Sequence, residues 1–174
     1  AVFAPGVFQA AVPQSGYADW VHFFDYNEEL GHVKLLAYEF VPDKAGAGKY
    51  RGGVAFRRDY RFLEEEAVLQ VRADRMTHRP FGLYGGSPGR PSENTLNPDS
   101  ENRELPGKFT MTIRKGEVFR HVLAGAGGWG DPLERDPNAV LKDVRNELLS
   151  LAKAEADYGV IIDVTDGEIR LKEL

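Results

Sequence analysis

The feature that most constrains this chain is the glycine-rich stretch Gly125-Ala126-Gly127-Gly128-Trp129-Gly130-Asp131, which is followed by Pro132 and Pro137. Glycine tolerates positive φ and lets other groups approach the backbone closely. Proline disfavours helix in the residue before it. The stretch therefore predicts a shaped loop, and we expect no helix to begin before Asp136. Strand patterns precede this loop, and the one long helical pattern follows it.

The composition is that of a globular protein of one domain, or one domain with a small appendage. The chain has 174 residues, of which 42% are hydrophobic and 28% charged, so it can bury a substantial core. It contains no cysteine, which excludes disulfides, thiolate catalysis and cysteine-ligated zinc. The net charge of -5 argues against a nucleic-acid partner. No apolar run is long enough to span a membrane, and no leader-like pattern opens the chain. We therefore expect a cytoplasmic protein.

Residues 1–32 show no sustained period and have an unusual composition. They hold seven of the nineteen aromatic residues, and the first basic residue is Lys34. Aromatic side chains of this density need a surface to pack on. We expect this irregular segment to pack either on its own domain or on protein outside this chain.

Several stretches between residues 33 and 123 predict strands. Residues 33–41 form an apolar, β-favouring run, and residues 54–62 alternate in the manner of a half-buried antiparallel strand. Residues 67–73, 109–113 and 118–123 supply further strands, the last two joined by a turn at Lys115-Gly116. Residues 76–107 lack a period and are predicted to form a long loop, a feature that is usually functional or partner-bound.

After the glycine stretch, the pattern changes to helical spacing. Asp136 suits the N-cap and Pro137 the first helical position, and apolar residues then recur to about Asp157. Gly159 is a natural helix end, and Asp166-Gly167 favours a short hairpin. The expected fold class is α+β: β-rich, mostly antiparallel sheet, with one long C-terminal helix at about 137–157 followed by a short hairpin. Residues 33–174 would form this domain.

Two sequence patterns resemble catalytic or nucleotide-binding motifs and fail on physical grounds. Gly125, Gly127 and Gly130 match a dinucleotide fingerprint, but that site needs a helix directly after the glycines. The run from Gly85 to Gly89 matches a nucleophile elbow, whose oxyanion hole needs an N–H on the residue after the serine. That residue is Pro88, which has no N–H. Neither motif predicts a site.

Metal and anion sites are weakly indicated. The four histidines are far apart in sequence, and His22 with Asp25 is the least unfavourable pair for a metal. We expect no metal site and no catalytic constellation. A group of arginines brackets the long loop and could hold an anion or a carboxylate, or could pair with local acids or a partner chain: Arg72, Arg75, Arg79 and Arg90.

Several long motifs, in order from about Glu39 to Asp163, resemble the C-terminal part of the hydantoinase B/oxoprolinase family. They are Tyr38-Glu39-Phe40-x-Pro42-Asp43-x-x-Gly46-Ala47-Gly48-Lys49-Tyr50-Arg51-Gly52-Gly53, Ala73-Asp74-Arg75, Pro80-Phe81-Gly82-Leu83-Tyr84-Gly85-Gly86-x-Pro88-Gly89, Gly127 through Pro137, and Tyr158-Gly159-Val160.

The resemblance implies more than the residues show. Members of the family are large B-type subunits that work with an A-type subunit in ATP-dependent chemistry. Their activities include opening 5-oxoproline, hydantoin or lactam rings and carboxylating ketones such as acetone or acetophenone, with a carbonyl oxygen phosphorylated as a leaving group. The resemblance places nucleotide binding on the A-type partner and the metal ligands in the N-terminal portion of the B-type subunit, which this chain does not contain.

On this resemblance we expect the C-terminal structural and interface domain, fragment or split small subunit, of an ATP-dependent cyclic amide hydrolase. It would bind no cofactor itself; ATP and a divalent metal would belong to the full complex. Its expected partners are the A-type subunit and the N-terminal portion of the B-type subunit. The residues expected to support the interface lie in the loops: Arg75, Gly85, Gly86, Gly127, Gly128, Trp129, Gly130 and Asp131.

Three alternatives remain open from the sequence. One is a small subunit of a related ketone carboxylase, and another is a non-catalytic binding module. The third is a self-sufficient small enzyme that uses Arg75, Asp74 and His78 around the long loop.

Overall fold

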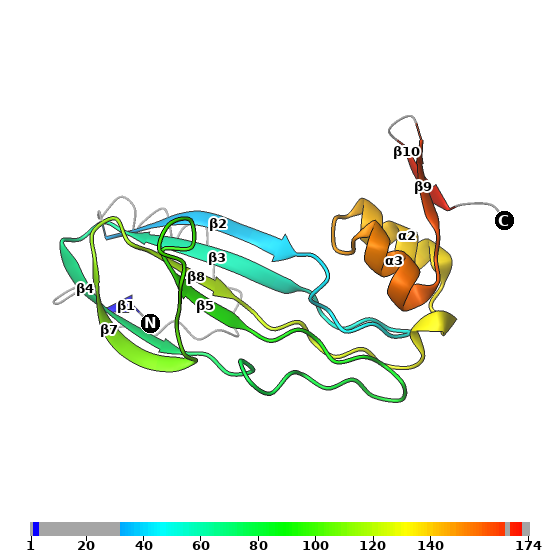
Figure 1. Cartoon of the computed structure of the whole chain (residues 1–174), viewed down its shortest axis with the longest axis horizontal. Coiled ribbons are helices and arrows are strands. Elements are labelled where there is room, and N and C mark those ends of the chain that lie inside the picture. Colours follow the sequence, from blue (N-terminus) through cyan, green and yellow to red (C-terminus); the bar gives the residue numbers. More distant parts are fainter. Residues whose placement is uncertain (1, 4–31, 166–167, 172–174) are drawn as a thin grey trace. The chain divides into compact units, whose positions relative to one another are not determined.

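A computed structural model describes residues 2–3, 32–165 and 168–171 of the chain (Figure 1). Most of the opening segment, including His22 and Asp25, therefore lies outside the described residues. Backbone contacts divide the chain into two units. The first comprises the described residues up to Glu39 with Arg57–Asp74 and Glu93–Val122; the second comprises Phe40–Phe56, Arg75–Ser92 and the described residues from Leu123 onward.

The larger sheet has five strands in the order β2-β3-β8-β5-β6, of which β2, β3, β8 and β5 are seen side by side in Figure 1. Strand β8 pairs antiparallel with β3 on one side and with β5 on the other. The strands expected at 33–41, 54–62 and 118–123 are thus present. Their bounds are β2 (Val33–Val41), β3 (Ala55–Phe62), β8 (Val118–Val122), β5 (Glu93–Leu96) and β6 (Arg103–Glu104).

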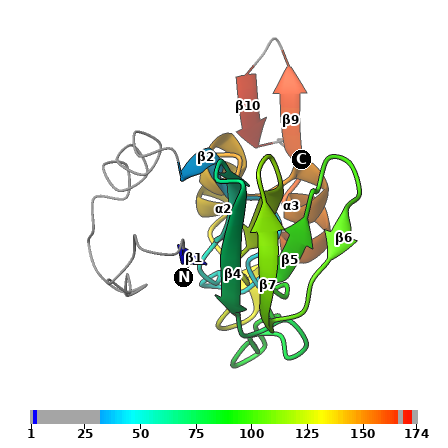
Figure 2. The same ribbon diagram turned by 90° about the vertical axis from the view of Figure 1, so that its left-hand side faces the viewer.

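The smaller sheet has the order β1-β4-β7, and Figure 2 shows β4 and β7 lying alongside each other. Its strands are β1 (Val2–Phe3), β4 (Glu66–Arg72) and β7 (Lys108–Arg114). Both pairings are antiparallel, with Ala67 opposite Ile113. Side chains from both sheets form one core, in which Phe62, Leu96 and Ile113 are fully buried.

The expectation of a loop without structure over residues 76–107 is wrong in its second half, where β5 and β6 form. Strand β5 has the sequence Glu-Asn-Thr-Leu, which carries no apolar alternation. It is a strand because β8 supplies a pairing edge. Asn94 is 2% exposed, and its amide donates to the Pro106 carbonyl at 2.9 Å. Tertiary pairing has overridden the local pattern here.

The second unit contains the helices and the hairpin. A single 3-10 turn, η1 (Pro132–Glu134), precedes α2 (Pro137–Arg145), and α3 (Leu151–Tyr158) follows. Asp136 caps α2 as expected, accepting from the Asn138 amide at 3.0 Å. Strands β9 (Ile162–Thr165) and β10 (Glu168–Leu171) form the predicted antiparallel hairpin. No helix among the described residues is long and apolar enough to cross a membrane.

The prediction of one long helix over 137–157 is wrong, because the pattern is broken between Arg145 and Leu151. Glu147 adopts φ of 57°, and Ser150 caps a new helix by accepting from the Lys153 amide at 3.2 Å. Asp43 also stabilises the interruption between the two helices. Its carboxylate accepts from the Ser150 amide at 2.8 Å, and its own amide donates to the Leu148 carbonyl at 3.3 Å. The apolar spacing runs through the break, so the sequence pattern did not reveal it. Gly159 ends α3 with φ of 67°, as expected.

A half-buried histidine joins β8 to β5 in the first unit. His121 Nδ1 lies 2.7 Å from the Asn94 Oδ1 atom. The pKa of His121 is lowered to about 4, chiefly by burial and also by the positive charge of Arg58, while a hydrogen bond to the Glu93 backbone acts in the opposite direction. The folded protein therefore holds His121 neutral where an unfolded chain would protonate it.

The first prediction concerns this pKa. Between pH 6.5 and pH 4 the unfolded state binds more protons than the folded state, so stability is fully present above pH 6.5 and falls as the pH falls. We expect His121 to account for a loss of up to about 3 kcal/mol over that range. Urea unfolding followed by circular dichroism at pH 7 and pH 4.5 measures it. A His121→Gln variant, which keeps a hydrogen-bonding amide, should lose that share of the pH dependence; an unchanged pH dependence would contradict the assignment.

Candidate functional site

Three glycine-rich segments run side by side in the second unit (Figure 1). We call them the first segment (44–53), the second segment (80–90) and the third segment (123–131). Each contains four glycines, so together they hold twelve of the nineteen in the chain. None of the three forms a regular helix or strand.

The backbones of the three segments are hydrogen-bonded in all three pairwise combinations. Gly46 N–H donates to the Ala126 carbonyl at 2.8 Å, which joins the first segment to the third. Leu83 N–H donates to the Gly128 carbonyl at 2.9 Å, which joins the second to the third. Ser87 N–H donates to Ala47 at 2.7 Å, which joins the second to the first. In a flat sheet the two outer strands cannot bond each other, so this arrangement is a closed bundle of three segments, here called the glycine bundle.

The glycine bundle leaves no room for side chains at its contacts. A Cβ added to Gly46 would lie 2.1 Å from the Ser87 carbonyl oxygen, and one added to Gly127 would lie 1.9 Å from that of Phe81. A Cβ on Gly52 would lie 2.0 Å from the Ala126 oxygen. The obstacles are backbone atoms, which cannot rotate away. The requirement resembles that of the collagen axis, where only glycine fits. The loop predicted from the glycines at 125–131 is therefore one of the three segments of the glycine bundle.

The structure gathers seven of the eight residues expected to support an interface. Gly85 and Gly86 in the second segment lie against the third segment, where a Cβ on Gly86 would lie 2.2 Å from the Gly128 oxygen. Asp131 caps η1 by accepting from the Leu133 amide at 2.9 Å. Gly127, Gly128, Trp129 and Gly130 complete the third segment. Their interface role stays a prediction.

Arg75 is the eighth of these residues, and it has a different setting. It adopts φ of 64°, and its carbonyl accepts from the Ser92 amide at 3.1 Å. Its side chain is exposed and has no hydrogen bond or ion pair among the described residues. Arg75 thus lies apart from the glycine contacts.

An exposed group of aromatic rings lies on the glycine bundle, with one ring from each segment. Trp129 is 44% exposed, Tyr50 is 63% exposed and Tyr84 is 79% exposed. The Trp129 ring centroid lies 5.6 Å from that of Tyr50 and 5.4 Å from that of Tyr84, with tilted planes. We call these three residues the aromatic surface. Such ring contacts are favourable in themselves, but the three rings still present large apolar area to solvent.

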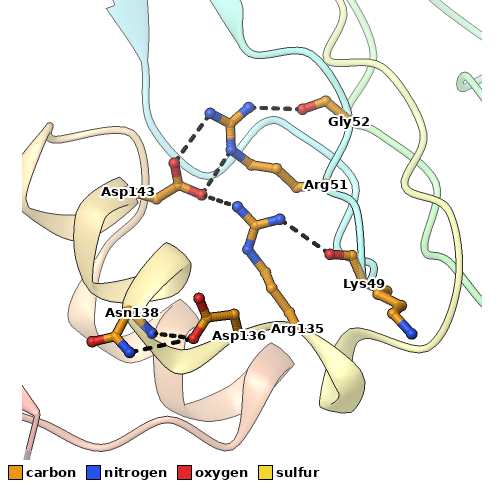
Figure 3. A network of polar contacts seen from close by, with 7 residues as sticks. All are labelled: Lys49, Arg51, Gly52, Arg135, Asp136, Asn138 and Asp143. Atoms are coloured by element: carbon orange, nitrogen blue, oxygen red, sulfur yellow. Dashed lines mark hydrogen bonds and ion pairs between the residues drawn. The ribbon is translucent and has the colours of Figure 1, made fainter.

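A buried carboxylate fixes the first segment to α2, as Figure 3 shows. Asp143 is 5% exposed and receives the Arg51 guanidinium through two bonds, from Nε at 2.8 Å and from Nη2 at 3.1 Å. Arg135 Nη2 donates to the same carboxylate at 2.8 Å. Arg51 Nη1 also donates to the Gly52 carbonyl at 3.0 Å. Paired charges of this kind fix geometry through directional hydrogen bonds. The network orients the first segment beside the aromatic surface.

Apolar packing supports the same junction. Ala47 of the first segment packs in a core cluster with Val140, Val144, Ala154 and Tyr158 of the helices. The Arg135 guanidinium lies 5.8 Å from the centroid of the Tyr158 ring, within cation–π range. Burial raises the pKa of Tyr158, while the charge of Arg135 acts in the opposite direction. Tyr158 is therefore held as a neutral phenol.

The group of arginines predicted around the long loop is only partly assembled. Arg79 and Arg90 line one cavity of about 330 Å³ in the second unit, and Arg72 and Arg75 do not. Arg79 is occupied with backbone carbonyls, donating to Gly89 at 2.8 Å and to Pro88 at 3.3 Å. Two carboxylates, Asp43 and Asp157, line the same cavity.

The hypothesis of a small enzyme built on Arg75, Asp74 and His78 finds no assembled site. Asp74 pairs with Lys108 at 3.2 Å, and all three side chains are exposed. In the part of the chain that the structure describes, no group of three or more histidines and carboxylates could hold a metal ion. What the arrangement offers is a closely packed scaffold with exposed aromatic rings.

Sequence reasoning missed four residues of this site: Tyr50, Arg51, Tyr84 and Asp143. The glycine content of 44–53 and 80–90 gave a signal, because each stretch holds four glycines, as the third segment does. Nothing local marked Asp143, whose neighbours read as an ordinary amphipathic helix.

Comparison with known proteins gives one family. The sequence profile of hydantoinase B/oxoprolinase matches residues 27–132. An uncharacterised protein of Methanocaldococcus jannaschii is 37% identical over 136 residues, covering 78% of this chain and 24% of that protein. The putative B-type subunit of a D-/L-hydantoinase from Pseudomonas sp. is 32% identical, covering 78% and 23%. The caprolactamase beta subunit of Pseudomonas jessenii is 33% identical, covering 75% and 23%.

Solved structures agree with the sequence comparison. The crystal structure of ATP-dependent caprolactamase from Pseudomonas jessenii superposes with a TM-score of 0.66 at 28% identity, covering 80% of this chain and 25% of that one. The nucleotide-free structure of acetone carboxylase gives a TM-score of 0.67 at 19% identity, covering 86% and 24%, which shows a shared fold. The chain spans about a quarter of the length of these three relatives.

The second prediction tests the glycine bundle with two neighbouring glycines. Gly52→Ala should destabilise the protein by about 3 kcal/mol or more, because its Cβ would overlap the Ala126 carbonyl. Gly53→Ala is the matched control: its Cβ would meet only the Ala126 side chain at 3.7 Å, and its effect should stay within about 1 kcal/mol. Thermal and urea unfolding of both variants measure the difference. Equal stability of the two would contradict the closed bundle.

The third prediction tests the buried carboxylate. Asp143→Asn keeps the side-chain shape but leaves two guanidiniums facing a neutral amide, and should cost about 3 kcal/mol of unfolding free energy. Glu134→Gln breaks an exposed ion pair with Lys49 in the same unit and should change stability little. Urea unfolding of both variants is the measurement. A small effect of Asp143→Asn would show that the network does not hold α2 to the first segment.

Proposed function

The chain belongs to the hydantoinase B/oxoprolinase family, and from this premise we propose that it is a structural and interface domain of an ATP-dependent enzyme that opens cyclic amides. In this proposal the chain corresponds to the C-terminal part of a B-type subunit. It supplies a rigid scaffold and a docking surface to the assembly, and other parts of the assembly supply the reacting groups.

The observation that carries the proposal is the exposed aromatic surface on the glycine bundle. A backbone assembly in which most of the glycines have no room for a Cβ cannot deform easily, so it holds attached rings in fixed positions. Tyrosine and tryptophan dominate protein–protein binding sites because they bury large areas with little loss of side-chain freedom. A rigid group of such rings is suited to binding another protein surface.

The names of the relatives support the class of reaction. Relatives are named as a hydantoinase subunit, a caprolactamase subunit and a 5-oxoprolinase. Hydantoin, caprolactam and 5-oxoproline are all cyclic amides. The solved caprolactamase is ATP-dependent. For this chain we propose partners of the same kind, an A-type subunit and the N-terminal portion of a B-type subunit, in the cytoplasm.

The cofactors of the reaction belong to those partners in this proposal. ATP and a divalent metal would be held by the other parts of the assembly, and this chain would contribute shape and contacts. The charge balance of -5 suits a protein rather than a nucleic-acid partner.

A ketone carboxylase subunit is the second candidate, because acetone carboxylase shares the fold. The acetone carboxylase alpha subunit is 24% identical to this chain and the acetophenone carboxylase delta subunit 26%. Both identities are lower than the 33% of the caprolactamase beta subunit. Cyclic amide hydrolysis is therefore the preferred reaction.

The fourth prediction separates these functions by activity. The chain alone, supplied with ATP and Mg²⁺, should release no ADP with hydantoin, 5-oxoproline or caprolactam. The assembly of A-type subunit, N-terminal B-type portion and this chain should hydrolyse ATP and open one of these rings, and omission of the chain should abolish turnover. Coupled ADP release and chromatography of the ring-opened product are the measurements.

Two results would change the proposal. Turnover by the chain alone would show that it carries catalytic groups. ADP release by the assembly only with bicarbonate and a ketone, and never with a cyclic amide, would identify the carboxylase function.

A further inference from the structure

The aromatic surface is continuous from ring to ring and belongs to the second unit alone. Its three rings come from three segments that are each bonded to the other two. The backbones of Tyr50 and Trp129 exchange two hydrogen bonds, at 2.9 and 3.0 Å. Trp129 also bridges to the backbone of Leu83, whose side chain is 50% exposed. Tyr50 and Trp129 are therefore anchored at their own backbones, and Tyr84 follows Leu83, whose backbone is bonded to the third segment.

This anchoring preorganises the aromatic surface for binding, because little ordering is left to occur on association. Ordering of flexible loops and side chains is a main cost of association. Here the backbones of Tyr50, Trp129 and Leu83 are fixed by hydrogen bonds, and each outer ring lies against Trp129. Burial of the exposed aromatic area would then contribute to binding with little ordering to offset it.

The lysine beside the aromatic surface is neutralised by an ion pair. Lys49, next to Tyr50, pairs with Glu134 at 3.0 Å. The pKa of Lys49 is raised by this hydrogen bond and by the charge of Glu134, so the lysine stays protonated. A transient encounter is usually steered by complementary unpaired charges, whereas permanent interfaces are more apolar. The chemistry around the rings therefore fits a permanent apolar interface.

The length of the relatives identifies a partner for such an interface. The chain covers 23 to 24% of the first three relatives that it matches and 25% of the solved caprolactamase chain. About three quarters of such a polypeptide therefore lies outside the matched part. In those relatives the two parts are joined covalently, which gives the rest of the polypeptide a high effective concentration at this surface. A separate A-type subunit has no such advantage.

We propose that the aromatic surface of Tyr50, Tyr84 and Trp129 docks the portion of a B-type subunit that this chain does not cover. The inference rests on the proposed function, and it deepens that proposal by assigning one of its two partners to a defined surface. The A-type subunit would then bind elsewhere in the assembly.

The fifth prediction uses Trp129 as its own reporter. The chain has two tryptophans, so Trp20→Phe leaves Trp129 as the sole source of tryptophan emission. The probe is the portion of the Pseudomonas jessenii caprolactamase beta subunit outside the matched 137 residues, added to the chain carrying that substitution. We expect a saturable blue shift of Trp129 emission and loss of quenching by acrylamide. A Trp-free version of the probe keeps the signal specific.

A variant pair locates the contact on the surface. Tyr84→Ala removes the most exposed of the three rings and should weaken binding at least about tenfold, because aromatic anchors carry much of the binding energy of an interface. Leu151→Ala, which shortens a 44% exposed apolar side chain on α3, is the control and should bind as the parent does. Unfolding midpoints of both variants confirm that each stays folded.

Defined results overturn the inference. The caprolactamase segment that corresponds to this chain must bind the same probe, which makes a negative result with this chain decisive. Binding of the probe without a change in Trp129 emission, or equal affinity of Tyr84→Ala and the parent, would place the contact elsewhere and leave the proposed function standing. A Trp129 response to the other caprolactamase subunit alone would assign the surface to the A-type partner. Binding to neither protein, together with failure of the activity assay, would overturn both proposals.

Discussion

Three backbones that bond one another in every pairwise combination leave no space for a Cβ between them, and the organisation of the second unit follows from this. Gly46, Gly52 and Gly127 each face a carbonyl oxygen of another segment at 2.1 Å or less from the Cβ position. The segments meet through hydrogen bonds rather than through a hydrophobic core. Such an assembly needs outside support, because glycine loses the most conformational freedom on folding.

The helices supply that support at two levels. Ala47 anchors the first segment in the apolar cluster of α2 and α3, and Asp143 holds Arg51 by paired hydrogen bonds. The break between the helices takes part, because Leu148 and Ser150 are hydrogen-bonded to Asp43, which directly precedes the first segment. A single uninterrupted helix would have those backbone groups occupied within itself. The interruption is therefore a connection between the helices and the glycine bundle.

The proposed role depends on two properties of the aromatic surface: its rings are exposed, and the scaffold that carries them is rigid. Trp129, Tyr50 and Tyr84 would be costly to expose on a protein that uses them for nothing else, and here they are carried by a scaffold in which most glycines have no room for a Cβ. Membership of the hydantoinase B/oxoprolinase family, at about a quarter of the length of its relatives, gives this surface a natural context in a larger assembly. The proposed role follows from what the surface can bind, and the family supplies the chemistry that such an assembly performs.

The sequence by itself determined the features that depend on near neighbours in the chain. The alternation in β3 and β4, the cap at Asp136, the left-handed Gly159 and the final hairpin were all predictable, because each is decided by residues a few positions apart. The glycines around Trp129 also indicated that other groups approach the backbone closely there. Only the tertiary structure decided what those glycines face. The closing of the three segments, the strand at Glu93–Leu96 and the partners of Asp143 join residues that are distant in sequence. Such contacts depend on the whole fold, and no local pattern encodes them.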